Sequence, residues 1–68
     1  MKLKELREDN DYTQEQIAKI INCKQNTYHQ YETEKRQLPI NALKKLCLYY
    51  NVSADYILDL PNLPYPKR

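Results

Sequence analysis

The sequence predicts an all-α fold in which five short helices form one compact bundle and an extended segment follows them. Side chains that suit the start of a helix precede several apolar runs, and within those runs apolar residues recur three and four positions apart. Three of the four prolines lie in the last eight residues, where they prevent a helix from continuing. A chain of 68 residues corresponds to one domain.

The first predicted helix covers residues 2–9, where Leu3 and Leu6 lie on one face. Asn10 and Asp11 follow it, and both residue types favour turns. We therefore expect the first helix to end at this pair.

The second predicted helix begins at Gln14. Thr13 is a suitable N-cap, and Gln16 three residues later completes a capping box. Tyr12 and Ile17 stand at the two positions of a hydrophobic staple, which fixes the direction of the entering chain. This is the sharpest local signal in the sequence.

The third predicted helix covers residues 24–33, and only Asn22 and Cys23 separate it from the second. Asparagine tolerates the left-handed backbone that helix ends require, so Asn22 can close the second helix. Helices joined by so short a turn cross steeply instead of packing antiparallel. One face of the third helix carries the tyrosines, and the other is polar: Gln25, Asn26, His29, Gln30 and Thr33.

The last two predicted helices follow a polar loop over residues 33–38. Pro39 suits the first turn of the fourth helix, and Asn51 can close it as Asn22 closes the second. Its apolar stripe has helical spacing: Leu43, Leu46, Cys47 and Tyr50.

Ser53 is the expected N-cap of the fifth helix. We assign residues 1–60 to the helical domain and residues 61–68 to an extended tail that contains three prolines. Two interpretations of the tail stay open: a polyproline-type ligand for a groove, or a simple unstructured end.

The bulk composition excludes some classes of function. The net charge of +2, from 11 basic and 9 acidic side chains, does not by itself indicate nucleic-acid binding. No run of apolar residues is long enough to cross a membrane, so we expect no membrane partner. The first six residues do not form a signal peptide, and we expect a cytoplasmic protein.

The cysteines and the histidine do not form a recognisable reactive site. Cys23 and Cys47 could form one disulfide, but we interpret them as small buried hydrophobic residues in a reducing compartment. His29 is the sole histidine and no C-x-x-C motif occurs, so a zinc site is unsupported. No catalytic constellation is present, and we expect neither an enzyme nor a cofactor.

Many of these positions form one ordered pattern with fixed spacing: Thr13-Gln14-Glu15-Gln16-Ile17-Ala18, Ile21-Asn22-Cys23, Thr27-Tyr28, Tyr31-Glu32, Leu43, Leu46 and Asn51-Val52-Ser53-Ala54-Asp55-Tyr56-Ile57-Leu58. The pattern resembles the phage-repressor and Cro-type helix-turn-helix family, also called the XRE family, over roughly residues 2–60. The resemblance implies a five-helix bundle like that of lambda repressor. In this family the third helix lies in the major groove of DNA, and dimers span half-sites about 34 Å apart.

The resemblance also implies roles for individual residues. Three positions match those that face base edges: Gln25, Asn26 and Gln30. Five positions match or neighbour contacts to phosphates: Gln14, Lys24, Thr27, Lys35 and Arg36. Tyr28 and His29 are possible additional DNA contacts. The family further pairs an arginine of the first helix with a glutamate closing the third, here Arg7 and Glu32, and we expect this ion pair to be structural.

The sequence departs from the family at several positions. The family usually has glycine where this chain has Asn22, Glu34 and Asn51. Glutamate is poorly suited to that backbone, so we expect the loop after the third helix to take another shape. Tyr28 is larger than the usual isoleucine or valine, and we expect it to tilt the third helix or to place its hydroxyl near a phosphate.

We therefore expect a sequence-specific regulator that binds double-stranded DNA, with a homodimeric repressor on a palindromic operator as the leading form. The low net charge supports a dimer, because each monomer can neutralise few phosphates. Tyr49 and Tyr65 have no evident core role and are candidates for the dimer interface. The alternative is an antitoxin or other protein-interaction module with the same fold, whose partner is a toxin or an antirepressor.

Overall fold

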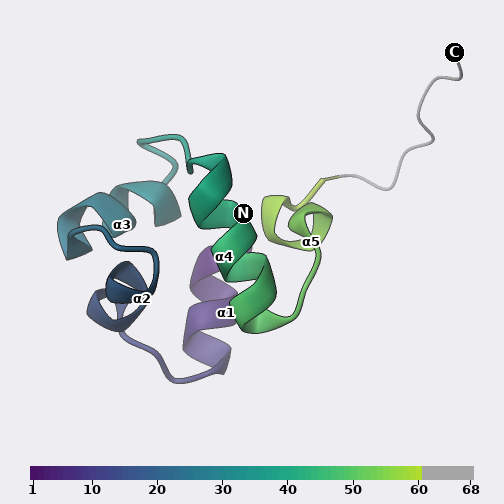
Figure 1. Cartoon of the computed structure of the whole chain (residues 1–68), viewed down its shortest axis with the longest axis horizontal. Helices are drawn as coiled ribbons and strands as arrows, with labels where there is room; N and C mark the ends of the chain where they lie inside the picture. Colours follow the sequence, from purple (N-terminus) through teal and green to yellow (C-terminus); the bar gives the residue numbers. More distant parts are fainter. Residues whose placement is uncertain (61–68) are drawn as a thin grey trace, which may run out of the picture.

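The computed structural model of the protein describes residues 1–60 and confirms the predicted all-α bundle (Figure 1). The five helices are α1 (Leu3–Asp9), α2 (Gln14–Ile20), α3 (Gln25–Glu32), α4 (Ile40–Tyr50) and α5 (Ala54–Leu58). Pro39 precedes α4 as its N-cap residue instead of occupying its first turn. The predictions for the tail at 61–68, Tyr65 included, lie outside the described residues.

The helices are arranged around α4, which lies in the centre of the molecule in Figure 1. The pair α2 and α3 lies on one side of it, and α5 lies on the opposite side. All five helices contribute buried side chains to one hydrophobic cluster, which includes Leu3, Ile17, Tyr28, Leu46 and Ile57. The surfaces of α3 and α5 are therefore separated by the common core.

The expected caps are present. The Thr13 hydroxyl accepts a hydrogen bond from the Gln16 backbone N–H at 3.1 Å, and the Thr13 N–H donates to the Gln16 side chain at 2.8 Å. The Ser53 hydroxyl accepts from the Tyr56 N–H at 3.1 Å. These contacts satisfy backbone donors that have no partner inside the helix, which fixes where α2 and α5 begin.

All five helices end in the same way, although the chain contains no glycine. A left-handed residue follows each helix: Asp11, Asn22, Glu34, Asn51 and Asp59, with φ between 57° and 60°. The next residue then donates its N–H to a carbonyl five residues back, as in Tyr12 to Arg7 at 3.0 Å and Cys23 to Ala18 at 2.9 Å. This pattern satisfies carbonyls at the end of each helix.

The expectation for Glu34 is therefore wrong, because the loop after α3 keeps the left-handed backbone that the family's glycine would give. The N–H groups of Lys35 and Arg36 both donate to the Gln30 carbonyl, at 2.9 and 3.2 Å, and this arrangement requires a left-handed Glu34. The Glu34 carboxylate also lies 3.6 Å from the Met1 amino group. These contacts outweigh the cost of the left-handed backbone at Glu34.

Three further side chains bear on the sequence predictions. Cys23 and Cys47 are free thiols, and both are half-buried against the core. Tyr49 has aromatic neighbours in its own chain, with its ring centroid 5.5 Å from those of Tyr12 and Tyr50.

Among residues 1–60, no helix is long and apolar enough to cross a lipid bilayer.

Candidate nucleic-acid interface

The polar face of α3 is open to solvent. Gln25, Asn26 and His29 are exposed, and Gln30 is half-buried. The Gln30 side-chain Nε2 donates to the Asn26 side-chain Oδ1 at 3.5 Å, so these two side chains point the same way one turn apart. The opposite face buries Tyr28 and Tyr31 in the core. The three residues expected to face bases are thus presented outward together.

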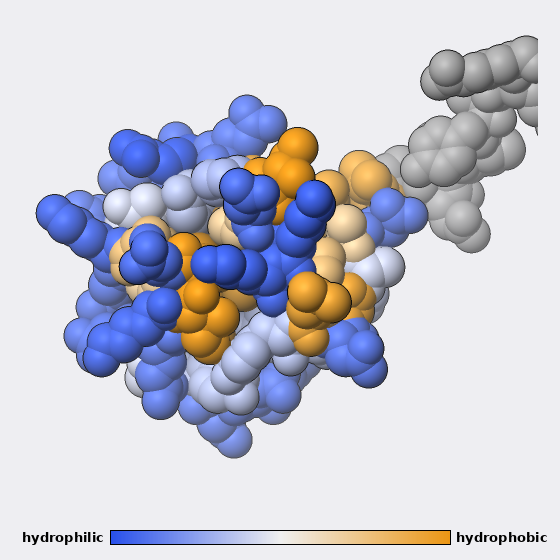
Figure 2. All heavy atoms as spheres, viewed as in Figure 1, coloured by the Kyte–Doolittle hydropathy of each residue, from blue (hydrophilic) through white to orange (hydrophobic). Residues whose placement is uncertain are grey.

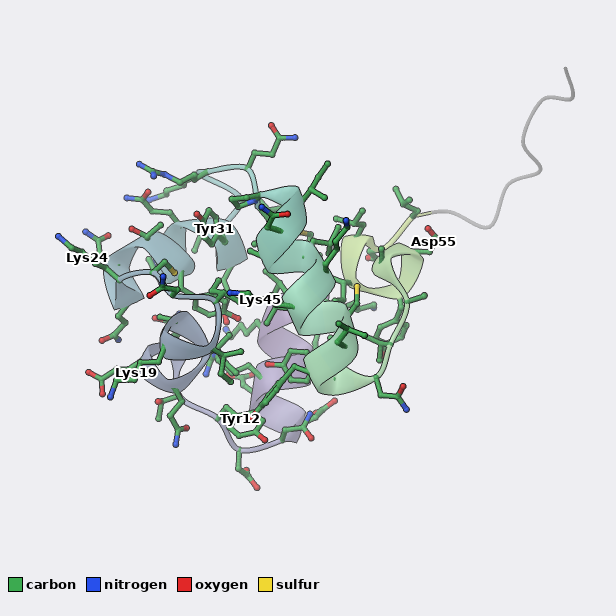
Figure 3. The ribbon with its side chains drawn as sticks, in the orientation of Figure 1. Tyr12, Lys19, Lys24, Tyr31, Lys45 and Asp55 are labelled. Carbon is green, nitrogen blue, oxygen red and sulfur yellow. The ribbon has the colours of Figure 1, made fainter. Side chains whose placement is uncertain are left out.

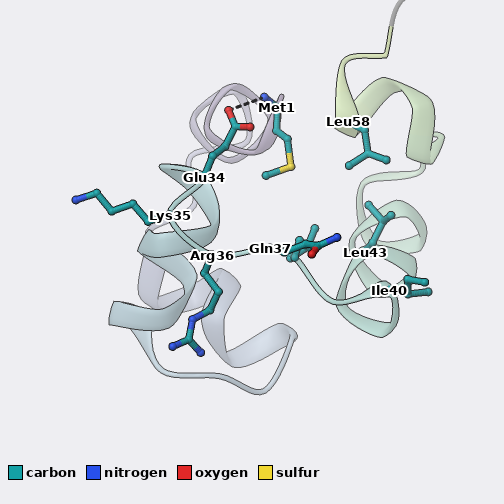
Figure 4. Close-up of a pocket in the computed structure, with 9 residues that line it drawn as sticks. Met1, Glu34, Lys35, Arg36, Gln37, Ile40, Leu43 and Leu58 are labelled. Carbon is teal, nitrogen blue, oxygen red and sulfur yellow. Dashed lines mark ion pairs between the residues drawn. The ribbon is translucent and has the colours of Figure 1, made fainter.

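Cations lie near both ends of α3. Lys24 precedes the helix and is exposed, while Lys35 and Arg36 follow it in the loop and are exposed too. A pocket lies between this loop, the start of α4 and the end of α5. Figure 4 shows the side chains of Lys35 and Arg36 pointing away from it. Within the described chain none of the three forms an ion pair. Thr27, the remaining expected phosphate neighbour on α3, is half-buried.

Sequence reasoning missed Lys19. This lysine lies in the last turn of α2 and is exposed. Figure 3 shows Lys19 and Lys24 both pointing outward at the α2–α3 end of the molecule. A lysine at the end of a helix is also typical of an ordinary solvated surface, because it suits the helix dipole, so the sequence alone gave no reason to single it out.

The structure brings Arg7 and Glu32 together across 25 positions of sequence. The Arg7 Nε donates to one Glu32 carboxylate oxygen at 2.6 Å, and Nη2 donates to the other at 3.2 Å. Their side chains are 12% and 3% exposed. Nη1 of Arg7 also donates to the Tyr12 carbonyl at 3.0 Å, so one guanidinium joins α1, the start of α2 and the end of α3.

The ionisation of this pair follows from its contacts. Burial alone would raise the pKa of Glu32, but the contacts with Arg7, the nearby Tyr28 hydroxyl and Gln14 outweigh it, and the pKa lies below its usual value. The same hydrogen bond to Glu32 raises the pKa of Arg7. Both side chains are therefore charged at neutral pH.

Gln14 has an internal role that the sequence did not reveal. Its amide Nε2 donates to Glu32 Oε1 at 3.1 Å and lies 3.2 Å from Nδ1 of His29. The residue is half-buried at the first position of α2. The side chain expected to hold a phosphate thus links α2 to α3, and a phosphate contact through the same nitrogen has to replace one of these partners.

Tyr28, which the sequence offered as a possible additional DNA contact, is fully buried. Its hydroxyl is out of reach of any phosphate and has no hydrogen-bond partner within the described residues, and the Tyr50 hydroxyl is in the same situation. Burial and the nearby Glu32 carboxylate raise the pKa of Tyr28 well above its usual value, and burial raises the pKa of Tyr50 to about 12. Tyr28 is therefore a core residue beneath the polar face of α3.

Helices α2 and α3 are joined by a short turn, and α3 has an outward polar face with cations near its ends. This arrangement defines a helix-turn-helix domain. A helix-turn-helix family model matches residues 3–57. The chain therefore belongs to the XRE-type helix-turn-helix family, as its sequence resemblance indicated.

Two curated relatives come from Bacillus subtilis (strain 168). The chain is 39% identical over 66 residues to the uncharacterized HTH-type transcriptional regulator YobD, covering 97% of this chain and 59% of the relative. It is 40% identical over 57 residues to the HTH-type transcriptional regulator ImmR, covering 84% of this chain and 45% of the relative. The chain thus spans about half the length of these relatives. No solved structure matches it significantly.

Proposed function

We propose that this domain binds double-stranded DNA sequence-specifically as part of a transcriptional regulator, with α3 in the major groove. The observation that carries the proposal is the outward polar face of α3, with exposed cations near both ends of the helix. The two relatives are named as HTH-type transcriptional regulators, which supports the same function.

The chemistry of the exposed face favours the reading of bases. Asparagine and glutamine can form two hydrogen bonds with adenine in the major groove, and each such pair discriminates against a wrong base by about 1–3 kcal/mol. We assign this role to Gln25, Asn26 and Gln30. The surrounding cations and Thr27 would hold phosphates, which positions the helix without reading sequence.

We further propose that the regulator acts as a homodimer on a palindromic operator and represses by occupying it. Support for a dimer comes from charge: with a net charge of +2, a single domain neutralises few phosphates and binds weakly. Two copies related by a two-fold axis would double these contacts, and the operator would share their symmetry.

The test is selection of bound sequences from a random pool of DNA duplexes. It is run with the unmodified protein and with Gln25→Ala, Asn26→Ala and Gln30→Ala. We expect a palindromic consensus, and each variant should lose preference at specific positions by about 1–3 kcal/mol. Asn41→Ala is the matched control, because it removes the same kind of side chain from the exposed surface of α4.

The control should keep the consensus of the unmodified protein. Failure to enrich any sequence at low salt would contradict the proposal and favour the protein-interaction alternative. A consensus that none of the three α3 variants changes would show that another element reads the bases.

A further inference from the structure

Two polar contacts meet at the amide of Gln14 and connect the start of α2 to α3. The amide nitrogen Nε2 lies 3.1 Å from Oε1 of Glu32 and 3.2 Å from Nδ1 of His29. An ionised carboxylate only accepts hydrogen bonds, so Glu32 fixes which end of the Gln14 amide faces these partners. His29 itself is exposed, and Figure 2 shows hydrophilic side chains over much of the surface at α2 and α3.

This geometry determines the protonation state of His29. The NH₂ group of Gln14 has two hydrogens and no acceptor, and Glu32 takes one of the hydrogens. Nδ1 of His29 therefore accepts the other, which requires a neutral ring whose proton is on Nε2. A protonated ring would direct an N–H of its own at the same NH₂ group, and two donors cannot form a hydrogen bond. The contact between Gln14 and His29 thus exists only while the ring is neutral.

The other groups around His29 do not hold its ring. Glu32, three positions further along α3, is paired with Arg7 of α1. Within residues 1–60 no hydrogen bond or ion pair joins the ring to α4 or α5. The remaining charged side chains on α2, on α4 and at the two ends of α3 are all exposed: Glu15, Lys19, Lys24, Lys35, Arg36, Lys44 and Lys45. Gln14 is therefore the partner through which the protein acts on the ring.

A DNA phosphate would compete with His29 for the same hydrogen. Gln14 is the side chain expected to donate to a phosphate, and one of its two hydrogens is directed at the exposed His29. The other is held by Glu32, whose side chain is only 3% exposed, so a phosphate can replace His29 more easily than Glu32. The displaced ring would lie on the outward face of α3 beside an anion, and a nearby anion favours the charged form of histidine.

We propose that His29 is a positioning residue whose proton uptake accompanies DNA binding. In the free protein the neutral ring holds the Gln14 amide against Glu32. In the complex a phosphate accepts the hydrogen of Gln14, and Nδ1 of His29 takes a proton from water and faces the DNA backbone as a cation. The complex then carries one more proton than the free protein, so the affinity for DNA rises as the pH falls. The inference deepens the proposed function and rests on it.

The first test measures the dissociation constant for the selected DNA duplex by fluorescence anisotropy, between pH 6 and pH 8 at constant ionic strength. We expect the affinity to rise by about tenfold as the pH is lowered over this range. His29→Asn places an acceptor oxygen near the position of Nδ1 but cannot be protonated, so it should lose most of this dependence. An α-amino group can titrate in the same range, but its contribution remains in the variant, and the difference between the two proteins belongs to His29.

Gln14→Ala separates the positioning role from a simple contact between His29 and DNA. Without Gln14 no donor favours the neutral ring in the free protein, so the change in affinity between pH 6 and pH 8 should shrink to less than about threefold. Gln37→Ala removes an exposed glutamine from the loop after α3 and is the matched control, which should keep the full dependence. Undiminished dependence in Gln14→Ala would overturn the positioning role.

The free protein provides a second test that does not involve DNA. In NMR spectra recorded over the same pH range, the side-chain amide of Gln14 should shift with the same midpoint as the ring of His29, and it should not shift in His29→Asn. An amide that ignores the protonation of His29 would overturn the inference and leave DNA binding standing. So would a protein that binds its duplex equally well at pH 6 and pH 8, whereas a protein that binds no DNA at any pH contradicts the proposed function itself.

Discussion

The two sides of the bundle are held by different kinds of contact. On the α2–α3 side, a partly buried ion pair between Arg7 and Glu32 and the amide of Gln14 link α1, α2 and α3. On the α5 side the buried side-chain contacts are apolar, the ion pair between Lys2 and Asp59 is exposed, and one backbone hydrogen bond runs from the Lys2 N–H to the Ile57 carbonyl at 2.8 Å. Hydrogen bonds fix direction, whereas apolar packing does not. The directional side-chain contacts are therefore placed where the angle of the candidate recognition helix is set.

The largest expected effect comes from breaking the ion pair between Arg7 and Glu32 on the α2–α3 side. Glu32→Ala leaves the Arg7 guanidinium without its carboxylate partner, and we expect a loss of about 3–5 kcal/mol in the free energy of unfolding. Asp59→Ala removes the exposed ion pair on the other side and should cost less than about 1 kcal/mol. Urea denaturation followed by circular dichroism measures both. Equal losses for the two variants would contradict the contrast.

An intermediate effect is expected at alkaline pH, where two tyrosine hydroxyls near the Arg7–Glu32 pair can be compared. Tyr28 on α3 and Tyr50 on α4 have raised pKa values in the folded protein because they are buried. The folded state therefore holds these protons more tightly than the unfolded chain does. Stability should be constant below pH of about 10, the ordinary tyrosine pKa, and should fall as the pH rises above it.

Tyrosinate absorbance during a pH titration, together with circular dichroism, tests this expectation. Tyr28→Phe should move alkaline unfolding to higher pH by more than Tyr50→Phe does, because the pKa of Tyr28 is raised further. Tyr56→Phe changes an exposed ring and is the control. Unfolding at the same pH in all three variants would show that the buried hydroxyls do not set the alkaline limit.

The smallest expected effect compares one helix end from each side. Glu34→Gly relieves an unfavourable left-handed glutamate after α3 and should stabilise the fold by about 0.5–1 kcal/mol. Asn51→Gly after α4 should change stability by only a few tenths of a kcal/mol, because asparagine already tolerates this backbone. Thermal unfolding resolves the difference. A destabilised Glu34→Gly would mean that the ion pair with Met1 matters more than the backbone strain.

Local signals predicted the helices well, because caps and spacing act within a few residues. Thr13 with Gln16, and Ser53, begin their helices where the sequence indicated. The outward face of α3 also followed from spacing and from the family resemblance. The feature that was missed depends on distant partners, because Gln14 meets His29 across 15 positions and Glu32 across 18. Helical spacing favoured a core position for Tyr28, and the structure shows it fully buried. Glu34 was misjudged because residue preference says nothing of the hydrogen bonds that Lys35 and Arg36 make.

The way in which the helices end has a consequence for the lifetime of the protein. Five left-handed residues with side chains, none of them glycine, together hold back on the order of 2 kcal/mol of stability. That amount is a substantial share of the stability of a small domain, which is roughly 5–15 kcal/mol. A smaller stability keeps a larger fraction of chains unfolded at any moment, and unfolded chains are those that proteases degrade. Replacing these residues by glycine should therefore slow the proteolysis of the protein.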